Sequence, residues 1–274
     1  MIAAAAGYSF NWPVFWHYVW PLSAFSDPLI RGGLVVTIYM AVLAEALGIV
    51  LGVFGALGQM SRFRAVRYLI SAYLLYFRGT PALVQLSLWY FGLSAIGLYS
   101  FPDLTLAGVT IPGVVQAGVI GLGVNEGAYM TEIVRAGIIS IDSGQMDAAK
   151  TLGMTFPRAM RYIILPQAAK VIIPPLGNQF NNMIKSTTLV VIIGGVELFN
   201  AFEQVNAVLF RPFELFLAAS MYYLFLTIVW TGVQARIESR LGDRRGQRLP
   251  SPLRRLVAGD GSIWSRSSGW LKPK

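Results

Sequence analysis

Apolar stretches alternate with short polar segments from about residue 30 to residue 240. A helix that crosses a membrane needs about 20 apolar residues, and five stretches are long enough: residues 33–57, 65–97, 112–138, 171–198 and 213–235. The second is interrupted at Arg78-Gly79-Thr80-Pro81, and the fourth at Pro174-Pro175 and again at the polar residues 178–185. The pattern predicts an all-α membrane protein with about five transmembrane helices.

Basic residues mark one side of the predicted membrane. With five spans, 18 of the 22 Lys and Arg residues fall on the same side: Arg62, Arg64 and Arg67; Arg135, Lys150, Arg158, Arg161 and Lys170; and those from Arg236 to Lys274. The other side receives Arg31 and Arg211. Because basic loops stay in the cytoplasm, we predict an outside N-terminus and an inside C-terminus.

Composition narrows the function. Hydrophobic residues make up 55% of the chain and charged residues 13%, whereas about a quarter of a soluble domain is charged. A net charge of +9 would suggest nucleic acid in a soluble protein, but membrane topology accounts for it here. The lack of cysteine excludes disulfides and thiol nucleophiles, and the single histidine, His17, excludes a histidine metal cluster within one chain.

The two ends form separate segments beside a transmembrane domain of residues 29–241. Residues 1–28 are aromatic, and Trp12, Trp16 and Trp20 recur every four residues. An extracytoplasmic helix at the membrane interface and an irregular tail both fit this segment, which lacks the features of a secretory signal. Residues 242–274 are basic and rich in Gly, Ser and Pro, which predicts a disordered cytoplasmic tail.

The polar segment of about residues 139–166 has the pattern of two short helices. Asp142 or the serine after it can cap the first helix, which would end at Gly153. Thr155 can cap the second, and Pro166 marks its end or a kink. Such a hairpin could pack on itself, but that does not explain why a membrane protein holds it out into the cytoplasm.

Within this segment stand Asp147-Ala148-Ala149, then Gly153, Ile163 and Leu165-Pro166. Their spacing resembles the cytoplasmic signature loop of binding-protein-dependent ABC importer permeases, with Asp147 in place of the usual Glu. Other motifs over about residues 30–240 resemble the polar amino-acid branch of that family, of the histidine, glutamine, arginine or glutamate type. They include Arg78-Gly79-Thr80-Pro81 with Gln85, Gly127-Ala128-Tyr129 with Glu132 and Arg135, Pro166-Gln167-Ala168, and Lys185-Ser186-Thr187-Thr188-Leu189.

The resemblance implies a type I importer permease of MetI-like architecture in the inner membrane of a bacterium. Its partners would be two ATPase subunits, a second identical or paralogous permease chain, and an extracytoplasmic amino-acid-binding protein. The chain lacks the phosphate-binding loop Gly-x-x-x-x-Gly-Lys-Ser/Thr, so it is not expected to be an enzyme, and ATP and magnesium would bind the partner ATPase. The residues expected to dock on that ATPase are Asp147, Ala148, Ala149, Leu152, Gly153, Arg158 and Arg161.

Charged and amide side chains inside the apolar stretches are candidates for the substrate pathway, because such groups usually face a cavity or a partner. Each has a structural alternative. Arg78 could bind a substrate carboxylate or pair with a glutamate; Lys185 could pair with Glu197 or Glu132; amides could join helices. The candidates are Arg78, Thr80, Gln85, Glu126, Asn178, Asn182 and Lys185.

Other interpretations remain open at this level. An ion-coupled secondary amino-acid transporter would use intramembrane carboxylates without an ATPase, but it has no need of a docking hairpin. A membrane enzyme ranks lower, because no nucleophile or acid–base constellation stands out. Gly48, Gly52 and Gly55 allow close helix contact, either between two chains or between neighbouring spans. The sequence does not reveal which amino acid is carried.

Overall fold

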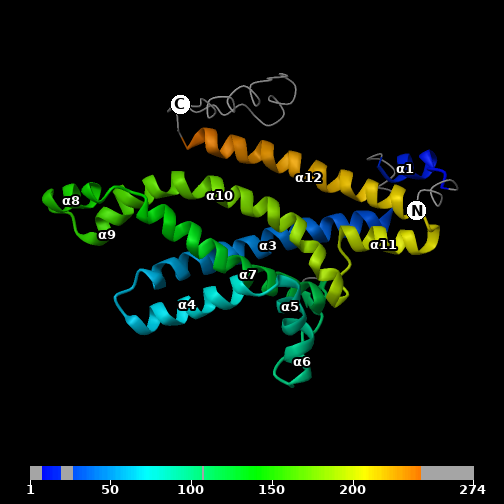
Figure 1. Cartoon of the computed structure of the whole chain (residues 1–274), viewed down its shortest axis with the longest axis horizontal. Coiled ribbons are helices and arrows are strands. Elements are labelled where there is room, and N and C mark those ends of the chain that lie inside the picture. The colour runs from blue at the N-terminus through cyan, green and yellow to red at the C-terminus, as the bar shows by residue number, and fades with distance from the viewer. Residues whose placement is uncertain (1–7, 20–26, 107, 242–274) are drawn as a thin grey trace, which may run out of the picture. The chain divides into compact units, whose positions relative to one another are not determined.

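The computed structural model describes residues 8–19, 27–106 and 108–241. Long helices follow one another along the chain (Figure 1): α3 (Pro28–Gln59), α4 (Arg64–Gly79), α7 (Gly113–Ile139), α10 (Leu165–Ser186) and α12 (Pro212–Arg240). A short helix, α1 (Trp12–Val19), precedes them. The predictions made for Trp20 and for the tail of residues 242–274 lie outside the described residues.

A break divides the second predicted span. Helix α4 stops at Gly79, and the chain continues as α5 (Ala82–Ser87), a π-helical turn η2 (Leu88–Gly92) and α6 (Leu93–Ala95). Thr80 and Pro81 between them have extended backbones, because proline disfavours helical conformation in the residue before it. The interruption predicted here is therefore confirmed.

A small β-hairpin departs from the all-α prediction. Strands β1 (Leu104–Leu106) and β2 (Val109–Ile111) pair antiparallel, with Thr105 opposite Thr110. Gly108 in the turn has φ 81°, a conformation that glycine adopts without steric cost. The hairpin lies directly before α7 and joins it to α6.

Three glycines of α3 pack against α7. A Cβ at Gly52 would lie 2.3 Å from Met130 Cβ, and one at Gly55 would lie 2.1 Å from Thr131 Oγ1. Gly48 likewise faces α7. Within one chain, these glycines thus let two neighbouring spans approach closely, which answers the question that the sequence left open.

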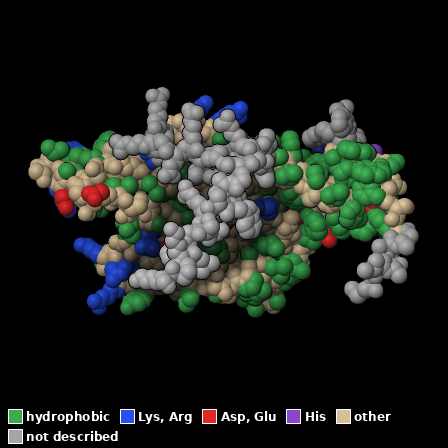
Figure 2. All heavy atoms as spheres, turned by 45° about the horizontal axis from the view of Figure 1, so that its top comes forward, with side chains coloured by type: hydrophobic (Ala, Val, Ile, Leu, Met, Phe, Trp, Pro, Cys, Tyr) green, Lys and Arg blue, Asp and Glu red, His purple; other side chains and the backbone are tan. Residues whose placement is uncertain are grey.

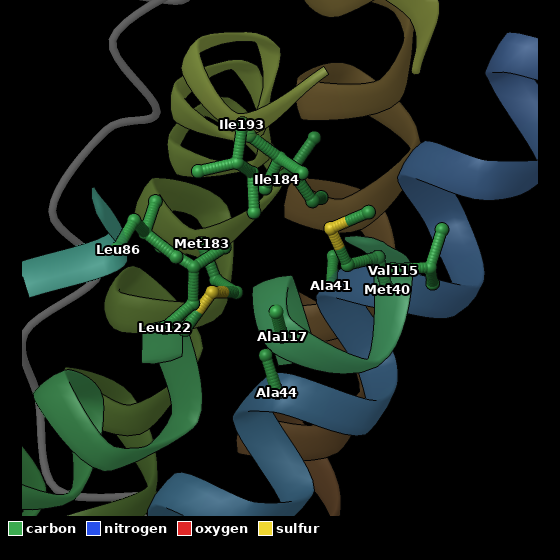
Figure 3. Packing of buried hydrophobic residues seen from close by; sticks show 11 residues of the cluster. Met40, Ala41, Ala44, Leu86, Val115, Ala117, Leu122, Met183, Ile184 and Ile193 are labelled. Carbon is green, nitrogen blue, oxygen red and sulfur yellow. The ribbon is translucent and has the colours of Figure 1, made fainter. Parts of the chain in front are cut away.

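The core joins segments that are far apart in the sequence. Figure 3 shows its residues converging from α3, α7, α10 and the 3₁₀ helix η4 (Thr187–Ile193), with α5 at one edge. The cluster consists of Met40, Ala41, Ala44, Leu86, Val115, Ala117, Leu122, Met183, Ile184, Val190 and Ile193. Packing of α5 here means that the segment after the Thr80 break is held inside the bundle.

The fourth predicted span differs from the sequence expectation in two ways. Pro174 and Pro175 lie inside α10 and do not interrupt it. The helical run ends instead at Gly194, whose φ is 84°, and a separate helix that we did not predict, α11 (Leu198–Leu209), follows. Glu197 caps α11 by accepting hydrogen bonds from two of its backbone N–H groups, so the predicted boundary at residue 198 is a helix start.

Length and hydropathy alone identify fewer spans than the five predicted. Among the described helices, α3 and α12 qualify, with mean hydropathies of 2.4 and 1.6; a third candidate is the run Phe156–Ile193 with α11, bent by 53°. Helix α7 carries Glu126, Glu132 and Arg135 along its 27 residues, and α4 is separated from α5 at Thr80. Polar residues therefore lower the hydropathy of α7, and the break shortens α4 to 16 residues.

Candidate functional site

The polar segment between α7 and α10 folds as a helical hairpin (residues 140–164), which we call the coupling hairpin after the role that the sequence predicts for it. Its first helix, α8 (Ser143–Thr151), starts at Asp142, whose Oδ1 accepts the Gly144 N–H at 2.7 Å. It ends at Gly153, with φ 75°. The Gly153 N–H donates to Lys150 O at 2.9 Å and the Met154 N–H to Ala149 O at 3.0 Å, a pattern that satisfies the last carbonyls of a helix.

The second half of the coupling hairpin continues directly into α10. Thr155 is the N-cap of α9 (Phe156–Ala159), as predicted, although its side chain makes no capping hydrogen bond. A π-helical turn, η3 (Met160–Ile164), follows, in which the Leu165 N–H donates to Met160 O. Pro166 then lies in the first turn of α10, directly after the π-turn, so it does not mark the end of the helical run, which was one of the two alternatives predicted for it.

Most residues predicted to dock on an ATPase are exposed. Asp147, Ala148, Gly153, Arg158 and Arg161 are exposed, and Leu152 is 80% exposed. Ala149 is fully buried, with α8 packed on α9 and η3. Leu152 points to solvent, whereas Met146 packs against the buried cluster that includes Val134, Ile138 and Ile164. In this conformation Ala149 therefore supports the hairpin from within.

Arg78 lies beside the break after α4. Its Nη1 is 3.9 Å from Glu132 Oε1, and its guanidinium lies 5.7 Å from the centre of the Tyr129 ring. Glu132 also binds Arg135, at 2.8 Å. Helices α3, α4 and α7 border a cavity of about 520 Å³, and Gln59, Arg78, Tyr129 and Glu132 are among the residues that line it. The glutamate pairing considered from the sequence is the one the structure shows.

The buried Gln85 side chain makes hydrogen bonds across the break between α4 and α5. Its Nε2 lies 3.0 Å from Phe77 O, 3.0 Å from Thr80 O and 2.8 Å from Thr80 Oγ1. Its Oε1 accepts from Asn125 Nδ2 at 2.9 Å, and the Gln85 side chain is buried at 2% exposure. Thr80 Oγ1 donates to Tyr76 O at 2.8 Å. Thr80 and Gln85, predicted for the pathway, are thus occupied in holding α4 and α5 together.

A polar face runs along α10. Asn178, Asn182 and Lys185 are exposed on it. In the described part of the chain, neither Glu197 nor Glu132 lies within ion-pair distance of Lys185. This face therefore presents two exposed amides and one ammonium group, and no carboxylate of the described residues pairs with that ammonium group.

The polar face of α10 leads to a buried carboxyl group. Asn182 Nδ2 lies 3.2 Å from Gln179 Oε1, and Gln179 Nε2 donates to Glu126 Oε1 at 2.8 Å. Glu126 itself is 7% exposed. The sequence selected Glu126 and Asn182 but not the bridging Gln179, because a single glutamine in an amide-rich stretch carries no signal of its direction.

Comparison with known proteins assigns this arrangement to a family. Residues 48–243 match the family described as "Binding-protein-dependent transport system inner membrane component". The chain belongs to this family of permeases. The permease is 38% identical over 234 residues to the arginine transport system permease protein ArgU of Corynebacterium glutamicum, covering 84% of this chain and 71% of that one. It is 32% identical over 226 residues to the glutamine transport system permease protein GlnP of Escherichia coli strain K12, covering 82% and 97%.

Solved structures of ABC transporters contain chains with a similar fold. A crystal structure of an amino acid ABC transporter with histidines matches with a TM-score of 0.69 and 38% identity, covering 78% of this permease and 95% of that chain. An inward-facing methionine ABC transporter, MetNI, matches with a TM-score of 0.64 at 16% identity, covering 85% and 100%, which shows the shared fold. The permease is therefore a multi-pass inner-membrane subunit of an ABC importer for polar amino acids. The ATPase of such a system is a separate subunit, and dependence on a binding protein implies that partner as well.

Proposed function

We propose that the permease crosses the membrane five times, with its N-terminus outside and its C-terminus inside. The arrangement of its ends supports this. The turn between α3 and α4, the coupling hairpin and the last turns of α12 lie at one end of the described chain, whereas α1, α11 and the start of α12 lie at the other (Figure 1). Lys and Arg side chains gather at the end with the coupling hairpin (Figure 2), as expected for a cytoplasmic face.

The coupling hairpin is the part that receives force from the ATPase. Asp147, Ala148, Leu152 and Gly153 form its exposed contact, with Arg158 and Arg161 at the side. The observation that carries this proposal is that α8 is capped at both ends and packs on the rest of the hairpin through buried Ala149, while Asp147, Ala148 and Leu152 are exposed. A preorganised surface of this kind loses little conformational entropy on docking.

The pathway for the amino acid runs along the polar face of α10, between this permease and a second permease chain. Asn178, Asn182 and Lys185 line it. Buried Glu126 is connected to Asn182 by the hydrogen bonds of Gln179. Lys185 suits the α-carboxylate that every amino acid carries. Arg78 borders the cavity beside Glu132, where its charge is already paired, so it contributes less to substrate binding than Lys185.

Reconstitution of the permease with its ATPase and binding protein in vesicles tests this function. Labelled polar amino acids should accumulate against a gradient only with internal ATP and the binding protein. Vanadate should stop uptake, and a protonophore should not. Uptake by the permease alone, or uptake abolished by the protonophore, would instead indicate an ion-coupled carrier.

Gly153 offers a direct test of coupling. Its left-handed backbone has open space around the Cβ position, so a substitution acts through conformation rather than by collision. Valine in this conformation costs about 1–2 kcal/mol, and Gly153→Val should displace the end of α8 and lower the amount of amino acid imported per ATP hydrolysed. Gly153→Asn is the matched control, because asparagine tolerates a positive φ. Equal coupling ratios for both variants would contradict the assignment.

A further inference from the structure

Two glutamates from neighbouring helices lie together in the transmembrane core, and we call them the carboxyl pair. Glu45 of α3 is 5% exposed, and Glu126 of α7 is 7% exposed. Gly48, one turn after Glu45, faces Glu126: a Cβ there would lie 2.9 Å from both Cβ and Cγ of Glu126. Glu45 shares with Gly48 and Gly52 the buried face of α3 that packs on α7, so both acidic side chains lie at the same helix contact. Gly48 therefore allows the two acidic side chains to occupy one site.

The two members of the carboxyl pair have unequal surroundings. Glu126 accepts a hydrogen bond from Gln179 Nε2 at 2.8 Å, whereas neither oxygen of Glu45 has a hydrogen-bond partner among the residues that the structure describes. Ion pairs within the described residues include neither glutamate. From α4, Tyr73 faces Glu126, but its hydroxyl donates to Val124 O at 2.6 Å; from α10 comes the uncharged Gln179. Among the described residues, Gln179 therefore donates to one carboxyl group of the pair, and the other carboxyl group receives no hydrogen bond.

Glu197 shows what a buried carboxyl group with a full set of hydrogen-bond donors looks like in this protein. Its Oε2 accepts from the Tyr223 hydroxyl at 2.7 Å, from the Phe199 N–H at 3.0 Å and from Thr37 Oγ1 at 3.3 Å; its Oε1 accepts from the Asn200 N–H at 2.9 Å. An ionised carboxylate only accepts hydrogen bonds, and burying one without donors is costly. In the carboxyl pair, Glu45 receives no such hydrogen bond from the described residues.

We propose that the carboxyl pair is a proton-binding site of the membrane domain, with Glu45 held as the neutral acid beside Glu126. A proton on Glu45 removes both the uncompensated charge and the repulsion between two adjacent carboxylates. Glu126 is connected through Gln179 to Asn182 on the exposed face of α10, so the charge of the pair acts on that face. The proton site itself does not depend on that face being the substrate pathway.

Carbodiimide labelling of the whole importer complex tests the protonation directly. Dicyclohexylcarbodiimide is apolar and modifies protonated carboxyl groups inside membranes. At neutral pH, peptide mass spectrometry should find Glu45 modified and Glu197 unmodified. Glu45→Gln should abolish modification of the pair, because Glu126 then keeps its Gln179 donor and loses its acidic neighbour, whereas Glu126→Gln should leave Glu45 modified. Modification of Glu197 to the same extent as Glu45 would overturn the proposal.

Infrared spectroscopy of the same complex does not depend on access by a reagent. The carbonyl band of a protonated carboxylic acid should weaken in Glu45→Gln relative to the wild type and remain in Glu197→Gln. An unchanged band in Glu45→Gln would overturn the proposal whatever the labelling shows. Import measured in vesicles provides the functional readout: the decline of wild-type uptake at alkaline pH should become smaller in Glu45→Gln, and superimposable pH profiles would refute an effect of the pair on transport.

Discussion

Gln85, predicted from the sequence for the substrate pathway, makes hydrogen bonds across the break between α4 and α5. Its amide binds Phe77 O, both oxygens of Thr80, and Asn125. Gln85→Leu would leave buried polar groups unsatisfied at a cost of about 1–3 kcal/mol each, so we expect a clear loss of thermal stability in detergent. The surviving folded protein should import its amino acid with an unchanged KM, because the side chain supports the helix break and does not contact substrate.

Ser87 supplies the control for that measurement. It lies two residues further along, and its exposed hydroxyl donates to Leu83 O at 3.1 Å. Ser87→Ala should change the stability by no more than about 0.5 kcal/mol. A raised KM in Gln85→Leu with unchanged stability would return Gln85 to the pathway, where the sequence analysis had placed it.

The sequence identified most polar residues of the candidate site but not their directions. Arg78, Thr80 and Gln85 share a polar segment, and composition alone cannot tell which side chain closes a helix break and which faces a cavity. Ala149 illustrates the same limit: the spacing of its motif was recognised, but only the packing of α8 on η3 shows that it is buried. Direction depends on tertiary contacts, which no local pattern contains.

At the scale of helices, the contact of α3 with α7 depends on small residues. Gly52→Val would force a side chain into Met130, whose Cβ would lie 2.3 Å from the new Cβ. Overpacking of this kind costs about 1–3 kcal/mol, and the two helices must separate to relieve it. We expect a lower unfolding temperature for the detergent-solubilised protein and a lower yield of the assembled complex.

Gly32 in the same helix provides the comparison. Nothing lies within 4 Å of its Cβ position, so Gly32→Ala should leave the stability unchanged or raise it by up to about 1 kcal/mol, as expected for alanine in a helix. Equal destabilisation by both substitutions would mean that glycine matters in α3 for a reason other than contact with α7.

Helices with strong apolar patterns were predictable, and those shaped by tertiary contacts were not. The limits of α3, α7 and α12 fall within a few residues of the predicted spans. Pro174-Pro175 misled the prediction, because α10 continues through both prolines. Side chains of α12 contact α10 at this point: Gln234 Nε2 lies 3.2 Å from Pro174 O and Trp230 Nε1 lies 2.7 Å from Gly177 O. Contact with a neighbouring helix helps proline to remain within a transmembrane helix, and the local sequence does not show that neighbour.

Across the whole molecule, charge and hydropathy carry different information about the membrane. Hydropathy alone selects α3, α12 and one bent run, because the other segments are broken or carry polar groups that face protein. The distribution of Lys and Arg does not depend on that packing, and these side chains gather at the end that holds the coupling hairpin (Figure 2). Five crossings reconcile the two, since they bring the connections with several basic residues to the coupling hairpin's side and leave Arg31 and Arg211 on the other side.

Single cysteines can test this topology, because the sequence contains no cysteine. Ser9 before α1 and Ser239 near the end of α12 are both exposed, and an odd number of crossings puts them on opposite sides of the membrane. A membrane-impermeant maleimide should label Ser9→Cys on intact cells after removal of any outer barrier, and Ser239→Cys only in inverted vesicles.

Two further positions locate the functional faces in the same experiment. Val208→Cys, in α11 at 76% exposure, should behave like Ser9→Cys, and Ser143→Cys, at the start of α8, should behave like Ser239→Cys. Bound ATPase should protect Ser143→Cys if the coupling hairpin docks there. Labelling of Ser9 and Ser239 from the same side would require an even number of crossings, and labelling of Ser143→Cys from outside would remove the hairpin from the reach of any cytoplasmic ATPase.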